Sequence, residues 1–304
     1  MKLLKSSTIF VIAAGLLGAV SGCSRDRIEA INLSNEGDQA VKVNVEGAIQ
    51  KYEQAIDLDP TNHRILWKLA GAYEKKEDWD KMASTLSRAV QVAPDFANYW
   101  GARGHALVME ARTGNMDAYK QAQEPLKKCI EKDPNLADCY NELGETDLWT
   151  DDEQGALDNY SKAIEHDPSK AYFYPDLANL YLTLKFYKEA EQTLQEGIKL
   201  TPPTEKNSAK IYNMYVLLAN VALAKGDKAG QVAAVEKAEQ FAGDSHPEFS
   251  FDLGSTYATM DPPQKEKALR LLNTFTKRVC KGAAAMKFKE QCEETSSMIQ
   301  KLGS

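Results

Sequence analysis

The side chains that could perform chemistry do not converge in this sequence. The histidines are scattered, and no pair has a metal-binding spacing such as HExxH. The segment at residues 243–246 has no strand before it, so it does not form a nucleophile elbow. No GxGxxG or P-loop pattern is present, and the many carboxylates fall on solvated faces of predicted helices. The sequence therefore predicts no enzyme, no cofactor and no metal site. The four histidines are His63, His105, His166 and His246.

The balance of charge argues against a nucleic-acid partner. The chain carries 37 Lys and Arg against 44 Asp and Glu, a formal net charge of −7, and no basic patch dominates. Binding of nucleic acid requires such a patch because phosphates must be neutralised. After the first 22 residues, no apolar run approaches the roughly 20 residues that a membrane-spanning helix needs. Nucleic acid is therefore not a predicted partner, and membrane attachment is predicted to be by lipid alone.

The beginning of the chain is similar to the signal sequence of bacterial lipoproteins. Two lysines precede an apolar stretch at residues 9–20, and Val-Ser-Gly then leads directly to Cys23. This length fits a secretory signal better than a spanning helix. The resemblance implies that residues 1–22 are cleaved, that Cys23 is acylated, and that residues 23–28 carry the lipid and form a short tether. An ordinary secretory signal with an incidental cysteine is the alternative.

The remaining cysteines predict disulfide bonds. Four of them follow Cys23, and an even number in an exported chain is typical of disulfide pairing. Three pairings are possible, and proximity in the sequence favours Cys129 with Cys139 and Cys280 with Cys292. Four buried free thiols are the alternative, because geometry decides whether a bridge can form. The spacing contains no CxxC and does not indicate a zinc site.

A proline recurs at nearly constant spacing and indicates stacked structural repeats. Each of five prolines closes a similar phrase, such as Ala-Ile-Asp-Leu-Asp before Pro60 and Ala-Ile-Glu-His-Asp before Pro168. Successive prolines are 34, 40, 34 and 34 residues apart. A period of this length predicts a solenoid, a class of protein that holds other molecules on an extended surface. The prolines are Pro60, Pro94, Pro134, Pro168 and Pro202.

The phrases resemble the tetratricopeptide repeat (TPR), a 34-residue helix-turn-helix unit with preferred residue types at positions 4, 7, 8, 11, 20, 24, 27 and 32. The units that begin at His63 and Ala171 fit at all eight positions, and the unit that begins at Ala137 departs only at Asp147. The apolar spacing places one stripe on each of two helices, and small residues let those helices approach closely. In the unit at His63 the eight residues are Leu66, Leu69, Ala70, Tyr73, Met82, Leu86, Ala89 and Pro94.

The resemblance implies an all-α fold, a right-handed TPR solenoid of about six to seven helix-turn-helix repeats. It implies a repeat array at residues 29–280 and a C-terminal capping helix at residues 281–304. Some units are irregular, and the first helix of the first unit matches the pattern poorly. Six extra residues near Gly114 predict a longer first helix and an enlarged turn. We expect Pro125 to kink the helix that follows or to end its first turn.

The resemblance also implies where a partner would bind. In TPR proteins the first helix of each unit lines the concave face, and positions 2, 5, 9, 12 and 13 are the usual ligand contacts. Aromatic anchors beside hydrogen-bonding amides suit an extended peptide or a partner helix. Solvation or packing between repeats is the alternative role of each residue. The predicted partner-binding residues are Arg64, Trp67, Lys75, His105, Met109, Asn141, Glu145, Trp149, Asn179 and Asn220.

The peptide-carboxylate clamp of chaperone-binding TPR proteins is not predicted. That clamp needs Lys, Asn and Arg side chains on three adjacent first helices. The residues at position 5 include no lysine, so anionic C-terminal peptides are not the favoured ligand. They are Trp67, Gly101, Asn141, Pro175 and Val216.

Together these features predict a lipid-anchored periplasmic scaffold on the outer membrane of a Gram-negative bacterium. Ser24 after the lipid cysteine, rather than Asp, favours outer-membrane sorting by analogy with enterobacterial lipoproteins. The scaffold would bind envelope proteins and help assemble or stabilise a machine such as a type IV pilus secretin, motility or secretion complex. In architecture the chain resembles the pilotin lipoproteins. The alternatives are an adaptor for peptidoglycan hydrolases or proteases, and a glycan- or solute-binding lipoprotein of an export system.

Overall fold

The described part of the chain folds into α-helices joined by short turns. This computed structural model describes residues 9–243, 246–282 and 284–303, with side chains from residue 25 onward. No β-strand occurs within these residues, so the predicted all-α class is confirmed. No helix in this part of the chain combines the length and apolar character that crossing a membrane requires. The predicted lipid attachment at Cys23 lies outside the residues whose side chains are described, as does the predicted signal segment.

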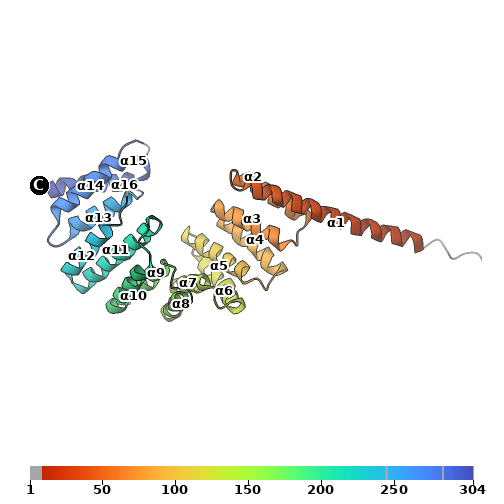
Figure 1. Cartoon of the computed structure of the whole chain (residues 1–304), viewed down its shortest axis with the longest axis horizontal. Coiled ribbons are helices and arrows are strands. Elements are labelled where there is room, and N and C mark those ends of the chain that lie inside the picture. The colour runs from red at the N-terminus through yellow and green to blue at the C-terminus, as the bar shows by residue number, and fades with distance from the viewer. Residues whose placement is uncertain (1–8, 244–245, 283, 304) are drawn as a thin grey trace, which may run out of the picture. The chain divides into compact units, whose positions relative to one another are not determined.

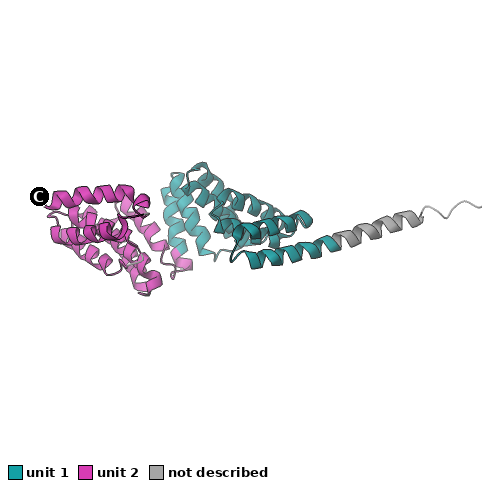
Figure 2. Ribbon diagram, turned by 90° about the horizontal axis from the view of Figure 1, so that it is seen from above, with its two compact units in different colours: residues 1–163 teal, residues 164–304 magenta. Residues whose placement is uncertain are grey.

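Two compact units divide the chain, Met1–Ala163 and Ile164–Ser304 (Figures 1 and 2). The first holds α1 (Ile9–Ala40), α2 (Val45–Leu58), α3 (His63–Lys75), α4 (Trp79–Val92), α5 (Ala97–Arg112), α6 (Asp117–Lys132), α7 (Ala137–Trp149) and most of α8 (Glu153–His166). The second holds α9 (Phe173–Thr183), α10 (Tyr187–Leu200), the 3₁₀ turn η1 (Glu205–Asn207), α11 (Ser208–Lys225), α12 (Lys228–Glu239), α13 (Glu248–Thr259), α14 (Lys265–Val279), α15 (Ala284–Lys287) and α16 (Lys289–Gly303).

Helical hairpins are the building block of both units. In the first unit α1 packs on α2, α3 on α4 and α5 on α6, and in the second α9 packs on α10, α11 on α12 and α13 on α14. Each of the five repeated prolines lies two residues beyond the last residue of a second helix, where the chain must turn. The side chains of Asn44, Asn62, Asp78 and Asp227 cap the helices that follow, because each accepts a hydrogen bond from a backbone N–H of the first turn.

The turn after α1 explains why the first repeat matches the pattern poorly. It comprises residues 41–44, one residue more than the turn between α3 and α4. Helix α1 ends three residues after Gly37, whereas α3 ends five residues after Ala70, so the first hairpin is one residue short overall and Gly37 takes the place of the small residue at position 8. A Cβ atom on Gly37 would lie 2.5 Å from the ring of Tyr52 in α2, so only glycine allows this approach. The hairpin is therefore regular once the register is shifted by one residue.

The six extra residues of the third repeat lengthen both of its helices. Helices α5 and α6 each have 16 residues, and the turn between them, residues 113–116, is only one residue longer than the turn before α4. The predicted longer first helix and enlarged turn are therefore confirmed. Pro125 is buried in the interior of α6, and the helix continues through it to Lys132. Of the two outcomes expected for Pro125, an end at the first turn is excluded, and a kink in α6 stays a prediction.

Two disulfide bonds close contacts between neighbouring helices. Cys129 of α6 is bonded to Cys139 of α7, and Cys280, just after α14, is bonded to Cys292 of α16. This is the pairing that sequence proximity favours. Helix α16 packs against α13 and α14, so the second bond fastens the C-terminal helix to the array. The described C-terminal segment is split into α15 and α16 rather than forming one helix.

Gly101 of α5 provides the space for the first disulfide. A Cβ atom on Gly101 would lie 2.8 Å from Sγ of Cys139 and 3.0 Å from Sγ of Cys129. Both sulfur atoms are held by α6 and α7 and cannot move aside as the end of a flexible side chain could. Position 5 of this repeat is therefore taken up by the disulfide and not by a residue that could contact a partner.

Replacing Gly101 with alanine tests this account. We expect Gly101→Ala to lower the free energy of unfolding of the oxidised protein by about 1–3 kcal/mol, the usual cost of overpacking. Gly71→Ala in α3 is the matched control, because nothing lies within 4 Å of the position that the added Cβ atom would take. It should be neutral or stabilising by up to about 1 kcal/mol. Denaturant unfolding measures both values, and equal stability of the two variants would contradict the account.

Candidate binding site on the first helices

The predicted partner-binding residues are distributed over both units. Helices α3, α5 and α7 of the first unit carry eight of them, and α9 and α11 of the second carry Asn179 and Asn220. Arg64, Lys75 and both of these asparagines are exposed. Asn141 departs from the expectation, since it is only 5% exposed and its side chain offers little surface to a partner. Its position in the middle of α7, against α5 and α6, accounts for that burial.

Trp67 belongs to a group of rings that we call the aromatic surface. It comprises Trp67 and His63 of α3, Tyr99 of α5 and Phe96 just before α5. The ring of Trp67 stacks on Tyr99 with centroids 5.0 Å apart, and Phe96 stacks on Tyr99, also at 5.0 Å. Trp67 remains 40% exposed and Phe96 50% exposed, whereas Tyr99 is buried. The group therefore presents two large rings on a base that is fixed by a third.

His63 fixes the base of the aromatic surface. Its Nδ1 lies 2.8 Å from the hydroxyl oxygen of Tyr99, and its ring lies 5.1 Å from that of Phe96. Because a buried tyrosine hydroxyl needs a hydrogen-bonding partner, this contact holds the Tyr99 ring in place. Sequence reasoning selected Trp67 but missed the other three residues, which lie outside the contact positions of the repeat.

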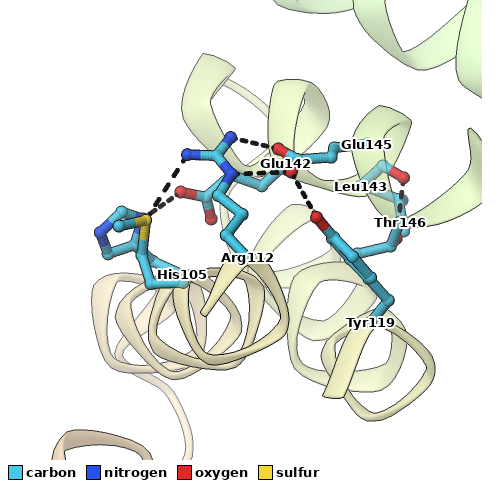
Figure 3. Close-up of polar contacts among 8 residues, drawn as sticks. His105, Arg112, Tyr119, Glu142, Leu143, Glu145 and Thr146 are labelled. Carbon is cyan, nitrogen blue, oxygen red and sulfur yellow. Dashed lines mark hydrogen bonds and ion pairs between the residues drawn. The ribbon is translucent and has the colours of Figure 1, made fainter. Parts of the chain in front are cut away.

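A second group of contacts joins α5 to α7. Nδ1 of His105 lies 2.5 Å from the carboxylate of Glu142. Arg112 donates two hydrogen bonds to Glu145, the one from Nε at 2.8 Å, and Tyr119 of α6 donates a third to the same carboxylate at 2.9 Å (Figure 3). His105 and Glu145 thus join neighbouring repeats to each other. Contact between repeats, the alternative to partner binding, is therefore the role that the structure shows for both residues.

The His105–Glu142 contact perturbs both groups. The hydrogen bond to Glu142 raises the pKa of His105 above its ordinary value, and burial offsets part of this rise. Burial of Glu142 raises the pKa of its carboxyl, while the hydrogen bond from His105 lowers it in part. Protonated His105 is therefore favoured in the folded protein, because the neighbouring carboxylate stabilises its charge.

Trp149 lies at the end of α7 and stacks on Tyr119, with ring centroids 5.2 Å apart and planes 12° apart. It is 55% exposed, so one face of the indole remains open.

Nearby Asp147, the residue that departs from the repeat pattern, is buried and accepts a hydrogen bond from Asn159 at 2.7 Å. Burial raises the pKa of Asp147. The side-chain amide of Asn159 in α8 thus provides a hydrogen-bonding partner for the buried carboxylate of Asp147.

Two junctions between first helices share one kind of polar contact, in which position 9 of one helix contacts position 6 of the next. His105 and Glu142 occupy these positions in α5 and α7. Asp38, which takes position 9 in the shifted register of α1, accepts a hydrogen bond at 2.6 Å from Lys68 at position 6 of α3. At each of these two junctions a carboxylate is matched by a cationic or protonatable partner.

The described residues show no arrangement suited to a metal. No group of three or more His, Cys, Asp or Glu side chains among them could hold an ion. His63 and His105 each contact a residue of the next repeat, Tyr99 and Glu142 respectively. His246 contacts Glu248 at 3.1 Å. The chemistry available at the first helices is therefore recognition by aromatic, amide and charged groups.

The α5–α7 contact predicts a dependence of stability on pH. Because the pKa of His105 is raised in the folded protein, the pair should stabilise fully below about pH 6.5, the pKa of an unfolded histidine. The stabilisation should be lost as the pH rises through the higher folded-state pKa. We expect His105→Gln to cost about 1 kcal/mol at pH 6, since the contact is partly screened by water, and less at pH 9.

Arg112→Gln is the control for this measurement. The guanidinium stays charged throughout the range, so the loss caused by this variant should change between pH 6 and pH 9 only through the small effect of its charge on the pKa of His105. Denaturant unfolding at both pH values gives the comparison. A cost of His105→Gln that is the same at pH 6 and pH 9 would show that the histidine acts by packing alone.

Comparison with known sequences identifies one repeat directly. The family model described as TPR repeat matches residues 44–77, which include α2 and α3. The Heat shock protein sti1 homolog of Schizosaccharomyces pombe is 25% identical over 246 residues, 78% of this chain and 40% of that protein. The General transcriptional corepressor trfA of Dictyostelium discoideum is 31% identical over 121 residues, 40% of this chain and 9% of that protein. The chain thus spans less than half the length of these relatives.

Solved structures share the arrangement of helices. A structure of Pseudomonas aeruginosa PilF has a TM-score of 0.54 and 16% identity, covering 76% of this chain and 99% of that one. MamA of Desulfovibrio magneticus has a TM-score of 0.51 and 16% identity, covering 57% of this chain and 94% of that one. At this identity the likeness concerns the fold. The chain has the all-α architecture of a TPR solenoid, and residues 44–77 carry a TPR repeat in sequence.

Proposed function

We propose that the chain is a lipid-anchored scaffold that binds a protein partner of the cell envelope through the aromatic surface. The observation that carries this proposal is the exposure of Trp67 and Phe96, each of which stacks on the buried ring of Tyr99. Tryptophan and other aromatic residues dominate the binding energy of protein interfaces, because they bury a large area at a small entropic cost.

The aromatic surface is preorganised, which favours binding. Tyr99 is held by the hydrogen bond with His63, and both exposed rings stack on it. A partner would therefore lose little freedom of the Trp67 and Phe96 side chains on binding. Arg64, one turn before Trp67 on α3, adds a cationic group whose charge acts on Tyr99. An apolar or aromatic anchor with an acidic neighbour is the kind of segment that such a surface fits.

Location in the envelope is supported by the disulfides and by the beginning of the sequence. Both bonds, Cys129–Cys139 and Cys280–Cys292, are of the kind that persists in an oxidising compartment. The lipoprotein-like segment before Cys23 would deliver the chain to the periplasm and anchor it, in our proposal on the outer membrane. There the scaffold would help to assemble or stabilise a secretin, motility or secretion complex, as in the pilotin-like architecture.

A chaperone-binding role is not proposed. The names of two relatives, the sti1 homolog and the Hsp70-Hsp90 organizing protein 3 of Arabidopsis thaliana, refer to heat-shock proteins. The carboxylate clamp of chaperone-binding TPR proteins is not predicted for this chain, because its position-5 residues include no lysine. One of those positions, Gly101, is moreover occupied by the disulfide.

The double variant Trp67→Ala/Phe96→Ala tests the binding surface. A photo-reactive residue at Arg64 in the native host should trap an envelope protein, and the double variant should abolish the adduct. The melting temperature should fall by only a few degrees, because each stacked pair contributes about 0.5–1.5 kcal/mol. Leu223→Ala, at an exposed leucine of α11, is the control and should leave the adduct intact.

The identity of the trapped molecule decides among the alternatives. A secretin, channel or motility protein supports the assembly role, and a cell-wall hydrolase or protease indicates an adaptor instead. A glycan in place of a protein would replace the proposal with a solute-binding function. An adduct that persists in the double variant would show that the aromatic surface is not the site.

Lipid anchoring is tested at Cys23. Cys23→Ala should prevent acylation and release the protein from the outer-membrane fraction into the soluble or inner-membrane fraction. The disulfides and the melting temperature should be unchanged, because residue 23 lies in the part of α1 that precedes Ala30, the first residue of the hydrophobic core. Separation of the membranes by density, followed by mass spectrometry of the N-terminal peptide, gives the result. Unaltered outer-membrane fractionation of the variant would disprove the anchor.

A further inference from the structure

One stretch of the second unit is strongly cationic in a chain that is acidic as a whole. Residues 267–289 contain seven Lys and Arg and no Asp or Glu, whereas the whole chain has a net charge of −7. Lys267 and Arg270 are paired with carboxylates of α12. The other five cations lie at the end of α14, at the start of α16 and between these helices, and all five are exposed. They are Lys277, Arg278, Lys281, Lys287 and Lys289.

The disulfide between Cys280 and Cys292 gathers these cations at one end of the unit. It holds the two Cα atoms 5.6 Å apart and closes the segment between them into a loop. Lys277 lies three residues before the first bonded cysteine, which is about one helical turn, or about 5.4 Å along the helix axis. Lys289 lies three residues before the second. Because the other three cations fall between these two lysines, all five are confined to the neighbourhood of the bond.

The closed loop also exposes an apolar side chain. Met286 of α15 is 84% exposed, and Ala284 in the same short helix is exposed as well. The loop is nevertheless attached to the core of the unit, because the ring of Phe288 lies 6.1 Å from the buried ring of Phe275. A methionine side chain is flexible and adapts to an irregular apolar environment. An apolar group is therefore available between cations at the surface.

The cations of this loop are only partly neutralised within the described residues. The three lysines that precede α16 have no ion-pair partner among those residues. Lys289 lies 3.9 Å from Glu293, and 76% of its side chain is exposed. The other carboxylates nearby are Glu290 and Glu294, also on α16. Five cations against these three carboxylates leave a net charge of +2 in residues 277–294.

We propose that these five cations and Met286, which together we call the cationic loop, dock on a membrane surface that contains anionic phospholipid. The lysines and the arginine would contact headgroup phosphates, and Met286 would enter the boundary between headgroups and acyl chains. Apolar groups flanked by cations are typical of segments that lie in a membrane surface. The second unit would thereby make a membrane contact of its own.

The kinds of cation favour a phospholipid surface over an acidic protein. Four of the five are lysines, and lysine is depleted in protein interfaces, whereas arginine is enriched there. The compact ammonium group of lysine binds phosphate as a point charge. A membrane surface also provides an apolar environment for Met286, which a charged protein surface does not.

This contact goes beyond the proposed scaffold function. It does not depend on acylation of Cys23, because the folded second unit supplies every group that takes part. It also involves none of the residues of the aromatic surface. Failure of the cationic loop would therefore leave the anchor and the aromatic surface standing, and failure of either of those would leave the loop.

Binding of residues 24–304 to vesicles tests the proposal, since this segment holds all three hydrophobic cores but lacks Cys23. We expect co-sedimentation with vesicles of equal parts phosphatidylglycerol and phosphatidylcholine, and at least about tenfold weaker binding to phosphatidylcholine alone. Lys281→Gln/Lys287→Gln should weaken binding to the anionic vesicles at least about tenfold, because each lysine near an anionic surface contributes a factor of about five. Met286→Ser should weaken it roughly threefold, since less apolar surface is buried.

Lys188→Gln/Lys199→Gln is the matched control, because it removes the same charge from two exposed lysines of α10 in the same unit. It should leave vesicle binding unchanged. All of the substituted side chains are exposed, so none of these variants should change the melting temperature by more than a few degrees.

Three outcomes would overturn the proposal. Equal weakening by the control would show that only the net charge matters, and unchanged binding of Lys281→Gln/Lys287→Gln would show that another surface contacts the vesicles. The third is an absence of vesicle binding, combined with a photo-reactive residue at Met286 that traps an acidic protein in the native host. That result would assign the cationic loop to a protein partner instead.

Discussion

Every element of this protein depends on contact between successive hairpins. One hairpin exposes an apolar face on each side, and only the next hairpin can cover it. In the first unit a single hydrophobic core, from Ala30 to Leu143, runs through the hairpins without interruption. The stability of such an array is a sum of contributions from contacts between neighbouring hairpins. A side chain that one of these contacts does not need is available to bind another molecule.

The sequence predicted the framework well because periodic residues control it. Each repeated proline lies just beyond the end of a second helix. The small and large residues of the pattern contact each other in pairs, as Gly37 and Tyr52 do once the register is corrected. The pattern left two outcomes open for Pro125, and α6 continues through it because surrounding contacts override a local preference. The loss of one residue between Gly37 and Tyr52 was also hidden, because it leaves the apolar stripe of each helix intact.

The candidate site was predicted less well, for a physical reason. The contact positions of the repeat select residues by their position on a single helix. In the structure, the role of a residue depends on which side chain of the neighbouring helix it contacts. His105 and Glu145 fit the contact positions but are engaged with Glu142 and Arg112. Phe96 lies outside those positions, is exposed and stacks on the same Tyr99 ring as Trp67. A search of the sequence for residues at positions 9 and 6 of adjacent repeats would have found the His105–Glu142 pair.

The disulfide between α6 and α7 has a mechanical consequence. Repeat arrays under tension come apart one hairpin at a time from an end, because each is held only by its neighbours. The bond between Cys129 and Cys139 prevents those two helices from separating under load, and the bond between Cys280 and Cys292 does the same for the last helix. Force applied along the chain would therefore separate the helices on either side of each disulfide before it could separate the two helices that the disulfide joins.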